Sequence, residues 1–220
     1  MISTLHSGPV ADAIERLYAA AQSGPRPGPR RAPGDRETER ERSVAERAAD
    51  AADAFMAISP DTGRLLYSFI RAAKPPTVVE FGMSYGISTL FLAAAVRDNN
   101  FGRIYTTELS EKKIAAAQKT FIDAGVGDLI TVLAGDARDT LTDIEGQVGV
   151  VLLDGWKELY LPVITLLESR MPTGAVVVAD NAESPDMAPY LDYVRDPANG
   201  YVSVNIAGKR NDTVEISSRV

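Results

Sequence analysis

The sequence predicts an α/β protein with a doubly wound, mostly parallel seven-stranded sheet, an antiparallel C-terminal hairpin and extra N-terminal helices. From residue 77 onward, short apolar runs rich in β-branched residues alternate with stretches of helical periodicity. Strands that are apolar on both faces are typical of a buried parallel sheet, and repeated β-α units with right-handed crossovers wind such a sheet. Near the C-terminus, the polar residues 208–212 separate two further strand-like runs, which predicts an antiparallel pair.

The elements of this core follow one another along the chain. Parallel strands are expected at residues 77–81, 103–107, 130–133, 148–153 and 175–179, and hairpin strands at 201–206 and 213–216. Helices are expected at residues 87–96, 111–124, 139–144, 161–170 and 187–194. We therefore assign residues 76–220 to the core of what we expect to be one structural domain, long enough to bury a sizeable interior.

Residues 1–75 have a different character. Helical spacing of apolar residues predicts helices over 9–21 and 36–58, and a Ser-Pro pair at Ser59 starts a third helix that ends before Pro75. Between the first two helices, residues 23–35 are dense in Pro, Gly and Arg, which indicates a mobile linker. We expect the linker and its flanking helices to form a lid over the substrate pocket.

Composition excludes several classes of protein. The chain has 23 Lys and Arg against 30 Asp and Glu, so its net charge of −7 argues against a nucleic-acid partner. It has no Cys and a single His, which removes disulfides and makes zinc sites and histidine-based triads improbable. No apolar run approaches the ~18 residues of a membrane span, and no secretory signal is visible, so we expect a cytoplasmic protein without a membrane partner.

The carboxyl ends of the first strands carry the features of a nucleotide site. Gly82 and Gly86 bracket the turn after the first strand, although Ser84 between them departs from the dinucleotide-binding fingerprint. Glu108 ends the second strand, where it can accept hydrogen bonds from ribose hydroxyls or cap the next helix. Asp136 follows the third strand, and the three strand ends together favour an adenosine-type ligand.

The next two strand ends carry oxygen-bearing side chains. Asp154 follows one strand, and Asp180 and Asn181 follow its neighbour. Oxygen donors suit Mg²⁺ or a similar hard cation, although acids at strand ends are also common as helix caps. Lys157 lies three residues after Asp154, within reach of the same edge.

These motifs resemble a known family. Glu80-x-Gly82, Ser88, Glu108 and Asp136-Ala137 resemble the S-adenosylmethionine-binding motifs of class I methyltransferases, which implies their Rossmann-like fold. The segments VLLDGWKELYLPVITLLE and VVVADN closely resemble the catechol and caffeoyl-CoA O-methyltransferase group, and Trp156-Lys157 favours the catechol branch. The resemblance covers roughly residues 55–212.

The resemblance implies how S-adenosylmethionine binds. Glu80 would meet its amine and Ser88 its carboxylate, while Glu108 would hold the ribose. Gly82 and Met83 would lie against the amino acid moiety, and Ala137 and Trp156 would border the adenine. Asp154 is also implied as a cofactor contact, and Met56 would flank the cofactor. A buried core methionine is the alternative role for Met56.

The resemblance also implies the chemistry. Asp154, Asp180 and Asn181 would hold Mg²⁺, and Lys157 would take the proton of a small catechol substrate. Asp212 would bind the second hydroxyl, with Asn211 as its rival, or both would only form the turn. The implied function is methyl transfer to one catechol hydroxyl in bacterial secondary metabolism, in a protein that could form a homodimer. A nucleotide-dependent oxidoreductase and a non-catalytic cofactor-binding relative stay open as alternatives.

Overall fold

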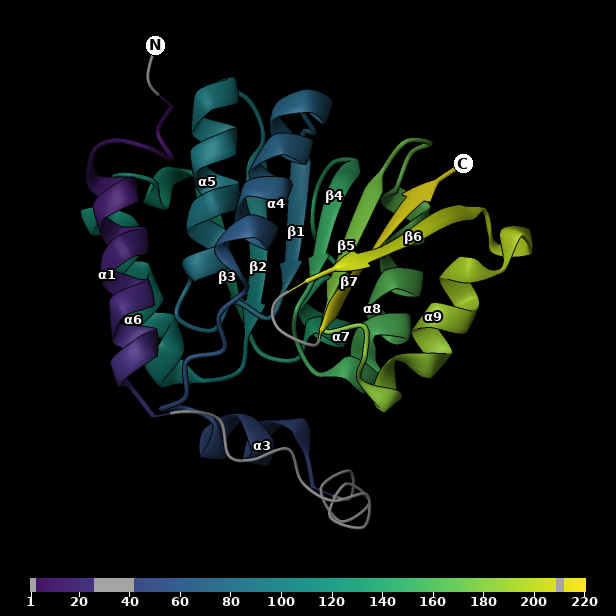
Figure 1. Cartoon of the computed structure of the whole chain (residues 1–220), viewed down its shortest axis with the longest axis horizontal. Helices are drawn as coiled ribbons and strands as arrows, with labels where there is room; N and C mark the ends of the chain where they lie inside the picture. Colours follow the sequence, from purple (N-terminus) through teal and green to yellow (C-terminus); the bar gives the residue numbers. More distant parts are fainter. Residues whose placement is uncertain (1–2, 26–41, 209–211) are drawn as a thin grey trace.

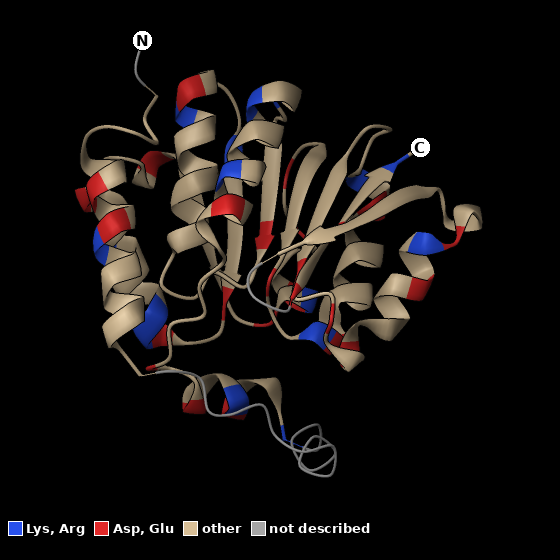
Figure 2. Ribbon diagram, viewed as in Figure 1, with Lys and Arg blue, Asp and Glu red and all other residues tan. Residues whose placement is uncertain are grey.

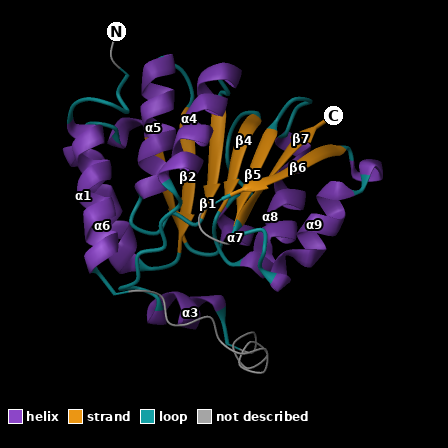
Figure 3. Ribbon diagram, in the orientation of Figure 1, coloured by secondary structure: helices purple, strands orange, loops and turns teal. Residues whose placement is uncertain are grey.

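A computed structural model describes residues 3–25, 42–208 and 212–220 of the chain. Figure 1 shows a single sheet with helices on both faces, and Figure 3 shows the same alternation of strand and helix along the chain. The strand order is β3-β2-β1-β4-β5-β7-β6. The strands are β1 (Thr77–Phe81), β2 (Arg103–Glu108), β3 (Ile130–Ala134), β4 (Val148–Leu153), β5 (Val176–Asp180), β6 (Tyr201–Ala207) and β7 (Thr213–Arg219).

The first five strands pair in parallel, and β7 pairs antiparallel with both β5 and β6. This confirms the predicted fold class and the C-terminal hairpin. The α-helices are α1 (Pro9–Ser23), α3 (Val44–Asp50), α4 (Pro60–Ala73), α5 (Ile87–Asn99), α6 (Glu111–Asp123), α7 (Ala137–Thr140), α8 (Tyr160–Leu167) and α9 (Ala188–Arg195). Short 3-10 helices lie at Gly127–Leu129, Lys157–Leu159, Glu168–Arg170, Pro185–Met187 and Pro197–Asn199.

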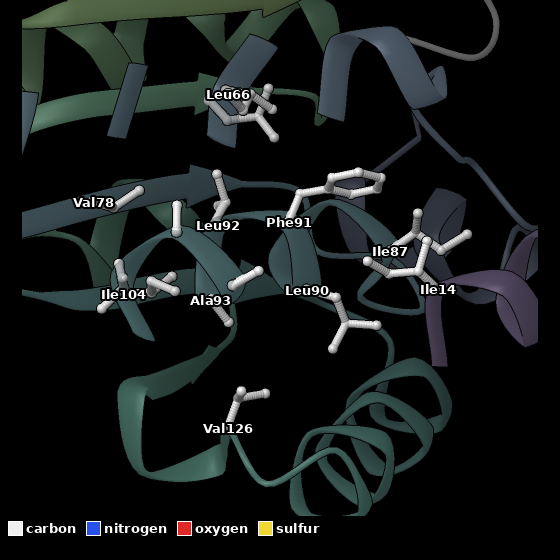
Figure 4. Packing of buried hydrophobic residues seen from close by; sticks show 14 of the residues in the cluster. Ile14, Leu66, Val78, Ile87, Leu90, Phe91, Leu92, Ala93, Ile104 and Val126 are labelled. Carbon is white, nitrogen blue, oxygen red and sulfur yellow. The ribbon is translucent and has the colours of Figure 1, made fainter. Parts of the chain in front are cut away.

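The strands separate two hydrophobic layers because their side chains alternate between faces. Val78 of β1 belongs to the layer packed by α1, α4, α5 and α6, while its neighbour Val79 belongs to the layer packed by α7, α8 and α9. Residues of α5 are buried continuously from Ile87 to Val96, so this helix has no solvent-facing stripe over that stretch. Figure 4 shows Leu90 and Phe91 of α5 within the first layer.

The N-terminal region differs from the sequence prediction in one element. The helix expected over residues 36–58 is much shorter, because α3 begins with a capping box between Ser43 and Glu46 and ends at Asp50. Beyond it, the Tyr85 hydroxyl donates to the Ala52 carbonyl at 2.8 Å, and the rings of Phe55 and Tyr85 stack 4.2 Å apart. These tertiary contacts hold residues 52–55 against the core, where a longer helix would carry them away.

Other boundaries shift by a few residues, and the short helix expected over 139–144 is found earlier, as α7. It starts there because the side chain of its N-cap, Asp136, accepts from the Arg138 amide. Most of the predicted linker, residues 26–35, lies outside the described residues, as does the start of the second predicted helix. None of the helices in the described ranges has the length and apolarity required for a membrane span.

Candidate active site

A cavity of about 660 Å³, counting the space at its open mouth, lies beyond the carboxyl ends of the central strands. Figure 2 shows acidic residues gathered at these strand ends. Ligands bind at this edge in open α/β sheets. The structure brings six of the predicted cofactor residues into the cavity wall: Met56, Gly82, Glu108, Ala137, Asp154 and Trp156.

The glycine turn after β1 packs directly on the turn after β4. Gly82 has a φ of 98°, and a Cβ at this position would lie 2.7 Å from the backbone oxygen of Asp154. Only glycine fits such a close approach with this backbone angle. The turn therefore packs the end of β1 against the end of β4. As a result Gly82, a predicted cofactor contact, and Asp154, a predicted metal ligand, lie on one wall of the cavity.

Glu108 is held rigidly at the end of β2. Its Oε1 accepts from the amides of Leu109 and Ser110 at 2.8 and 2.9 Å, and its Oε2 accepts from the Ser84 amide at 2.9 Å. Thus Glu108 both lines the cavity and caps the chain entering α6, whereas sequence reasoning treated these roles as alternatives. Its carboxylate presents the remaining lone pairs to the cavity in a fixed geometry.

Glu80 lies beneath the glycine turn and is fully buried. Its Oε2 accepts from the hydroxyls of Thr89 and Thr106, both at 2.5 Å, while its Oε1 has no hydrogen-bond partner within the described residues. Burial raises the pKa of this carboxyl. An orphaned buried carboxyl oxygen fits a cationic or hydrogen-bond-donating ligand group, such as the amine predicted from the sequence.

Two further predicted cofactor residues lie outside the cavity wall. Ser88 is buried on α5, and the Met83 side chain belongs to the first hydrophobic layer, with its amide donating to the Thr107 carbonyl at 3.0 Å. Met56 lines the cavity, is 41% exposed and lies past the end of α3. Its alternative role as a core methionine is therefore not observed.

Helix α3 lies past the strand ends (Figure 1), and Ala48 of the helix and its C-cap Ala51 border the cavity. The Arg47 guanidinium carbon lies 4.5 Å from the centroid of the Trp156 ring, and Arg47 forms an ion pair with Glu158. Sequence reasoning missed Arg47, since it reads as one charge of a solvated helix face although the residue is buried in the fold.

The ends of β4 and β5, where the metal ligands are predicted, meet at a buried tyrosine, Tyr160; we call this region the metal edge. The Lys157 ammonium donates to the Tyr160 hydroxyl at 2.5 Å and lies 3.5 Å from Asp154 Oδ1. The Tyr160 hydroxyl donates to the Asp180 carbonyl at 3.2 Å. Burial raises the pKa of Tyr160 well above its ordinary value, and the carboxylates of Asp154, Asp180 and Asp212 add to this. Tyr160, which sequence reasoning did not assign, therefore links the predicted base to the predicted metal ligands.

The donors at this edge are oxygens. Among the described residues, no three His, Cys, Asp or Glu side chains are grouped as a metal site. The ligands predicted from the sequence are the carboxylates of Asp154 and Asp180 and the amide of Asn181, whose backbone is left-handed with a φ of 64°. Such a set fits Mg²⁺, which takes few protein oxygens and keeps water or substrate ligands, better than it fits zinc.

Asp212 is buried and connects the C-terminal hairpin to this edge. Its Oδ2 accepts from the Asn181 side-chain amide at 2.7 Å, and its Oδ1 accepts from the Thr213 amide at 2.9 Å. The residue thus shapes the start of β7 and orients Asn181. Its contact with substrate stays a prediction, and its rival Asn211 lies outside the described residues.

Known proteins resemble this chain in sequence and in fold. A family profile described as a methyltransferase domain matches residues 79–182. Catechol O-methyltransferase from Sus scrofa is 29% identical over 147 residues, 64% of this chain and 78% of that protein. Catechol O-methyltransferase B from Danio rerio is 29% identical over 148 residues, 64% of this chain and 55% of that protein. With most such relatives, the match thus spans little more than half of the relative's length.

Solved structures agree with this relationship. The cofactor-bound protein Rv0187 from MTB has a TM-score of 0.68 at 26% identity, over 87% of this chain and 99% of its own. The O-methyltransferase TomG from Streptomyces achromogenes, solved in complex with SAM, has a TM-score of 0.68 at 21% identity, over 93% of this chain and 95% of its own. The latter likeness shows the fold.

The fold and the site define a class I methyltransferase. Within this class, the comparisons support an S-adenosylmethionine-dependent O-methyltransferase of the catechol and caffeoyl-CoA group, to which the motifs point. These comparisons do not support the oxidoreductase alternative, which Ser84, in place of a glycine of the dinucleotide fingerprint, also disfavours.

Proposed function

We propose that the protein transfers a methyl group from S-adenosylmethionine to one hydroxyl of a small catechol-type substrate, with the help of Mg²⁺ or a similar divalent cation. The observation that carries this proposal is a single cavity edge where Glu108 and Trp156 lie on the same wall as Asp154. The ammonium of Lys157 is held 3.5 Å from that carboxylate. This arrangement supports a continuous site for an adenosine and an acidic hydroxyl.

The cofactor assignments follow the geometry. Glu108 would accept from the ribose, Trp156 and Ala137 would border the adenine, and the orphaned Glu80 oxygen supports an amine nearby. When bound, S-adenosylmethionine supplies an electrophilic methyl group on a sulfonium. The residues here need only align it with the nucleophile, since orientation accounts for much of the barrier in such a transfer.

Acceptance of the substrate proton falls to Lys157. Its Nζ is held by the Tyr160 hydroxyl before substrate arrives, and the neutral amine form of the side chain would accept the proton. When bound by Asp154, Asp180 and Asn181, Mg²⁺ supplies Lewis acidity that favours the ionised hydroxyl. Asp212 would fix the second hydroxyl or, through its bond to Asn181, the ligand set itself.

The substrate and setting stay predictions of the sequence: a small catechol, a role in bacterial secondary metabolism, a cytoplasmic location and homodimer formation. The lid is also a proposal. The sequence predicts a lid over the substrate. Because Ala48 of α3 and its C-cap Ala51 border the cavity, we propose that α3 covers the cofactor as well.

Two measurements test this function. Thermal denaturation should show that S-adenosylhomocysteine, and not NAD, raises the melting temperature. Incubation of the protein with S-adenosylmethionine, Mg²⁺ and a panel of catechols should give O-methylated products, with the methylated hydroxyl identified by NMR. Binding of S-adenosylhomocysteine without turnover of any catechol would favour the non-catalytic alternative, and stabilisation by NAD alone would contradict the proposal.

A further inference from the structure

A buried lysine faces the cavity beside Glu108. Lys113 is the third residue of α6, and its amide donates to the side chain of Ser110 at 3.4 Å. The Lys113 side chain reaches the cavity wall, yet the residue is only 1% exposed. Lysine is almost never buried to this extent without a partner for its charge. The position of Lys113 therefore requires an explanation.

The protein itself satisfies this ammonium poorly. Its nitrogen lies 5.8 Å from the centroid of the Tyr85 ring, within reach of a cation–π interaction. Burial lowers the pKa of Lys113, and the attraction of Glu108 opposes this shift only in part. No hydrogen bond joins Lys113 Nζ to any residue within 3–25, 42–208 or 212–220. Three strong donors thus point into an environment that offers them no protein acceptor.

Glu108 does not supply that acceptor in this structure, and its remaining acceptor position is open to a ligand in the cavity. Both of its oxygens already accept backbone amides, three in total, which fix the carboxylate at the strand end. Glu108 and Lys113 are nevertheless the charged side chains on the wall shared by β2 and α6. A ligand placed between them meets a hydrogen-bond acceptor and a donor together.

We propose that Lys113 is a cofactor-binding residue, whose ammonium donates to the oxygen of a ribose hydroxyl that itself donates to Glu108. This inference rests on the proposed function, which places an adenosine ribose at Glu108. A hydroxyl has one hydrogen to donate and two lone pairs, so a carboxylate and an ammonium satisfy both of its capacities. A ribose that lacks the hydroxyl leaves the ammonium unsatisfied, and the pair therefore selects ribose over deoxyribose.

A purely structural lysine and a ligand-binding lysine predict opposite effects on the unliganded protein. A structural Lys113 would stabilise the fold, so its replacement would lower the melting temperature. A lysine that awaits a ligand destabilises the empty protein, because its charge is buried without a protein acceptor. Lys113→Met, which keeps length and removes charge, should therefore leave the melting temperature unchanged or raise it, while it weakens cofactor binding.

The test is calorimetry with S-adenosylhomocysteine and its 2′-deoxy and 3′-deoxy analogues. Lys113→Met should weaken binding of S-adenosylhomocysteine by about 10-fold or more. Removal of one of the two hydroxyls should weaken binding to the wild type by more than it weakens binding to Lys113→Met, in which the hydroxyl has only Glu108 as its partner. The control Lys119→Met changes a lysine on the same helix that is 76% exposed and paired with Asp123, and it should bind all three ligands as the wild type does.

Equal losses for both analogues in the wild type and in Lys113→Met would overturn the role of Lys113, as would unchanged affinity of Lys113→Met for S-adenosylhomocysteine. Lys113→Gln, which keeps a polar end without the charge, provides the same cycle if the methionine variant does not fold. A wild type that binds S-adenosylhomocysteine tightly while the cycle shows no coupling contradicts only this inference. A wild type that fails to bind it contradicts the proposed function as well.

Discussion

Glu108 combines a ligand-facing and a structural role. Replacement of Glu108 by Ala should weaken cofactor binding by about 1.5–3 kcal/mol, or about 10–150-fold, because a charged acceptor is lost. The sequence alone predicts little change in the stability of the unliganded protein. The three amides that bond to this carboxylate instead predict a loss of about 1–3 kcal/mol in the free energy of unfolding.

Calorimetry with S-adenosylhomocysteine and urea denaturation measure the two effects separately. Glu111→Ala is the matched control, since Glu111 is an exposed acid in the first turn of α6, three residues after Glu108. It should keep wild-type affinity. Unchanged affinity in Glu108→Ala would show that the ribose binds at another strand end.

Lys157 should affect the rate of chemistry and leave cofactor binding intact. Lys157→Ala should lower kcat by roughly 10²–10⁴, the usual contribution of a positioned general base. Higher pH should restore part of the loss, because a catechol ionised by hydroxide no longer needs the lysine. Steady-state kinetics across pH, with Lys119→Ala as the exposed control, measure this effect. A wild-type kcat in Lys157→Ala would show that another group accepts the proton.

At the scale of single residues, the sequence was sufficient to identify site residues at the ends of strands. It was not sufficient to identify residues whose role depends on burial in the tertiary structure. Gly82, Glu108 and Asp154 were found because parallel strands end at one edge. Lys113 and Arg47 lie on helices whose charges read as solvent-facing, and only the packed fold shows that both are buried. No local spacing distinguishes them from exposed lysines and arginines.

At the scale of elements, the N-terminal region is attached through side chains of the core. Asp98 in the last turn of α5 accepts from the amide and hydroxyl of Thr4, at 3.1 and 2.5 Å, and from the Tyr67 hydroxyl at 2.6 Å. Burial alone would raise the pKa of Asp98, but these hydrogen bonds and Arg71 lower it overall. The carboxylate is thus favoured in the folded state.

A depressed folded-state pKa contributes stability that is present above the unfolded value of about 3.9 and is lost as pH falls through the folded value. Asp98→Asn should therefore lower the free energy of unfolding at pH 7, and the difference from wild type should shrink below about pH 4. Urea denaturation across pH measures it, with the exposed Asp123→Asn as control. A difference that does not change with pH would mean that the charge of Asp98 is not what anchors Thr4.

The strands were easier to predict than the N-terminal helices. Buried parallel strands such as β1 and β4 can be recognised in the sequence as short runs of β-branched residues, and their predicted bounds are confirmed. The helix expected over 36–58 was wrong in length, because its apolar periodicity continues through Phe55 while the chain turns at Ala51. Phe55 meets Tyr85, a contact between residues 30 positions apart that periodicity cannot anticipate.

At the scale of the whole molecule, the sequence predicts the class of sheet but not the order of its strands. β1 lies between β2 and β4, so the chain reverses its direction of winding there, and the cavity lies beyond these strand ends. The switch point results from the crossovers of the entire sheet, and no single motif encodes it. The cofactor and metal motifs could be placed at the same edge of the sheet only on the assumption that the strands before them are parallel.

The central claim is that one sheet edge holds both a methyl donor and a divalent cation that serves the reaction. The dependence of the initial rate on Mg²⁺ concentration, compared between wild type and Asp180→Ala, tests it most directly. EDTA should abolish wild-type methyl transfer. Asp180→Ala should be impaired at low Mg²⁺ and partly restored by excess Mg²⁺, since a lost carboxylate weakens metal affinity. Full wild-type activity in the presence of EDTA would contradict the account.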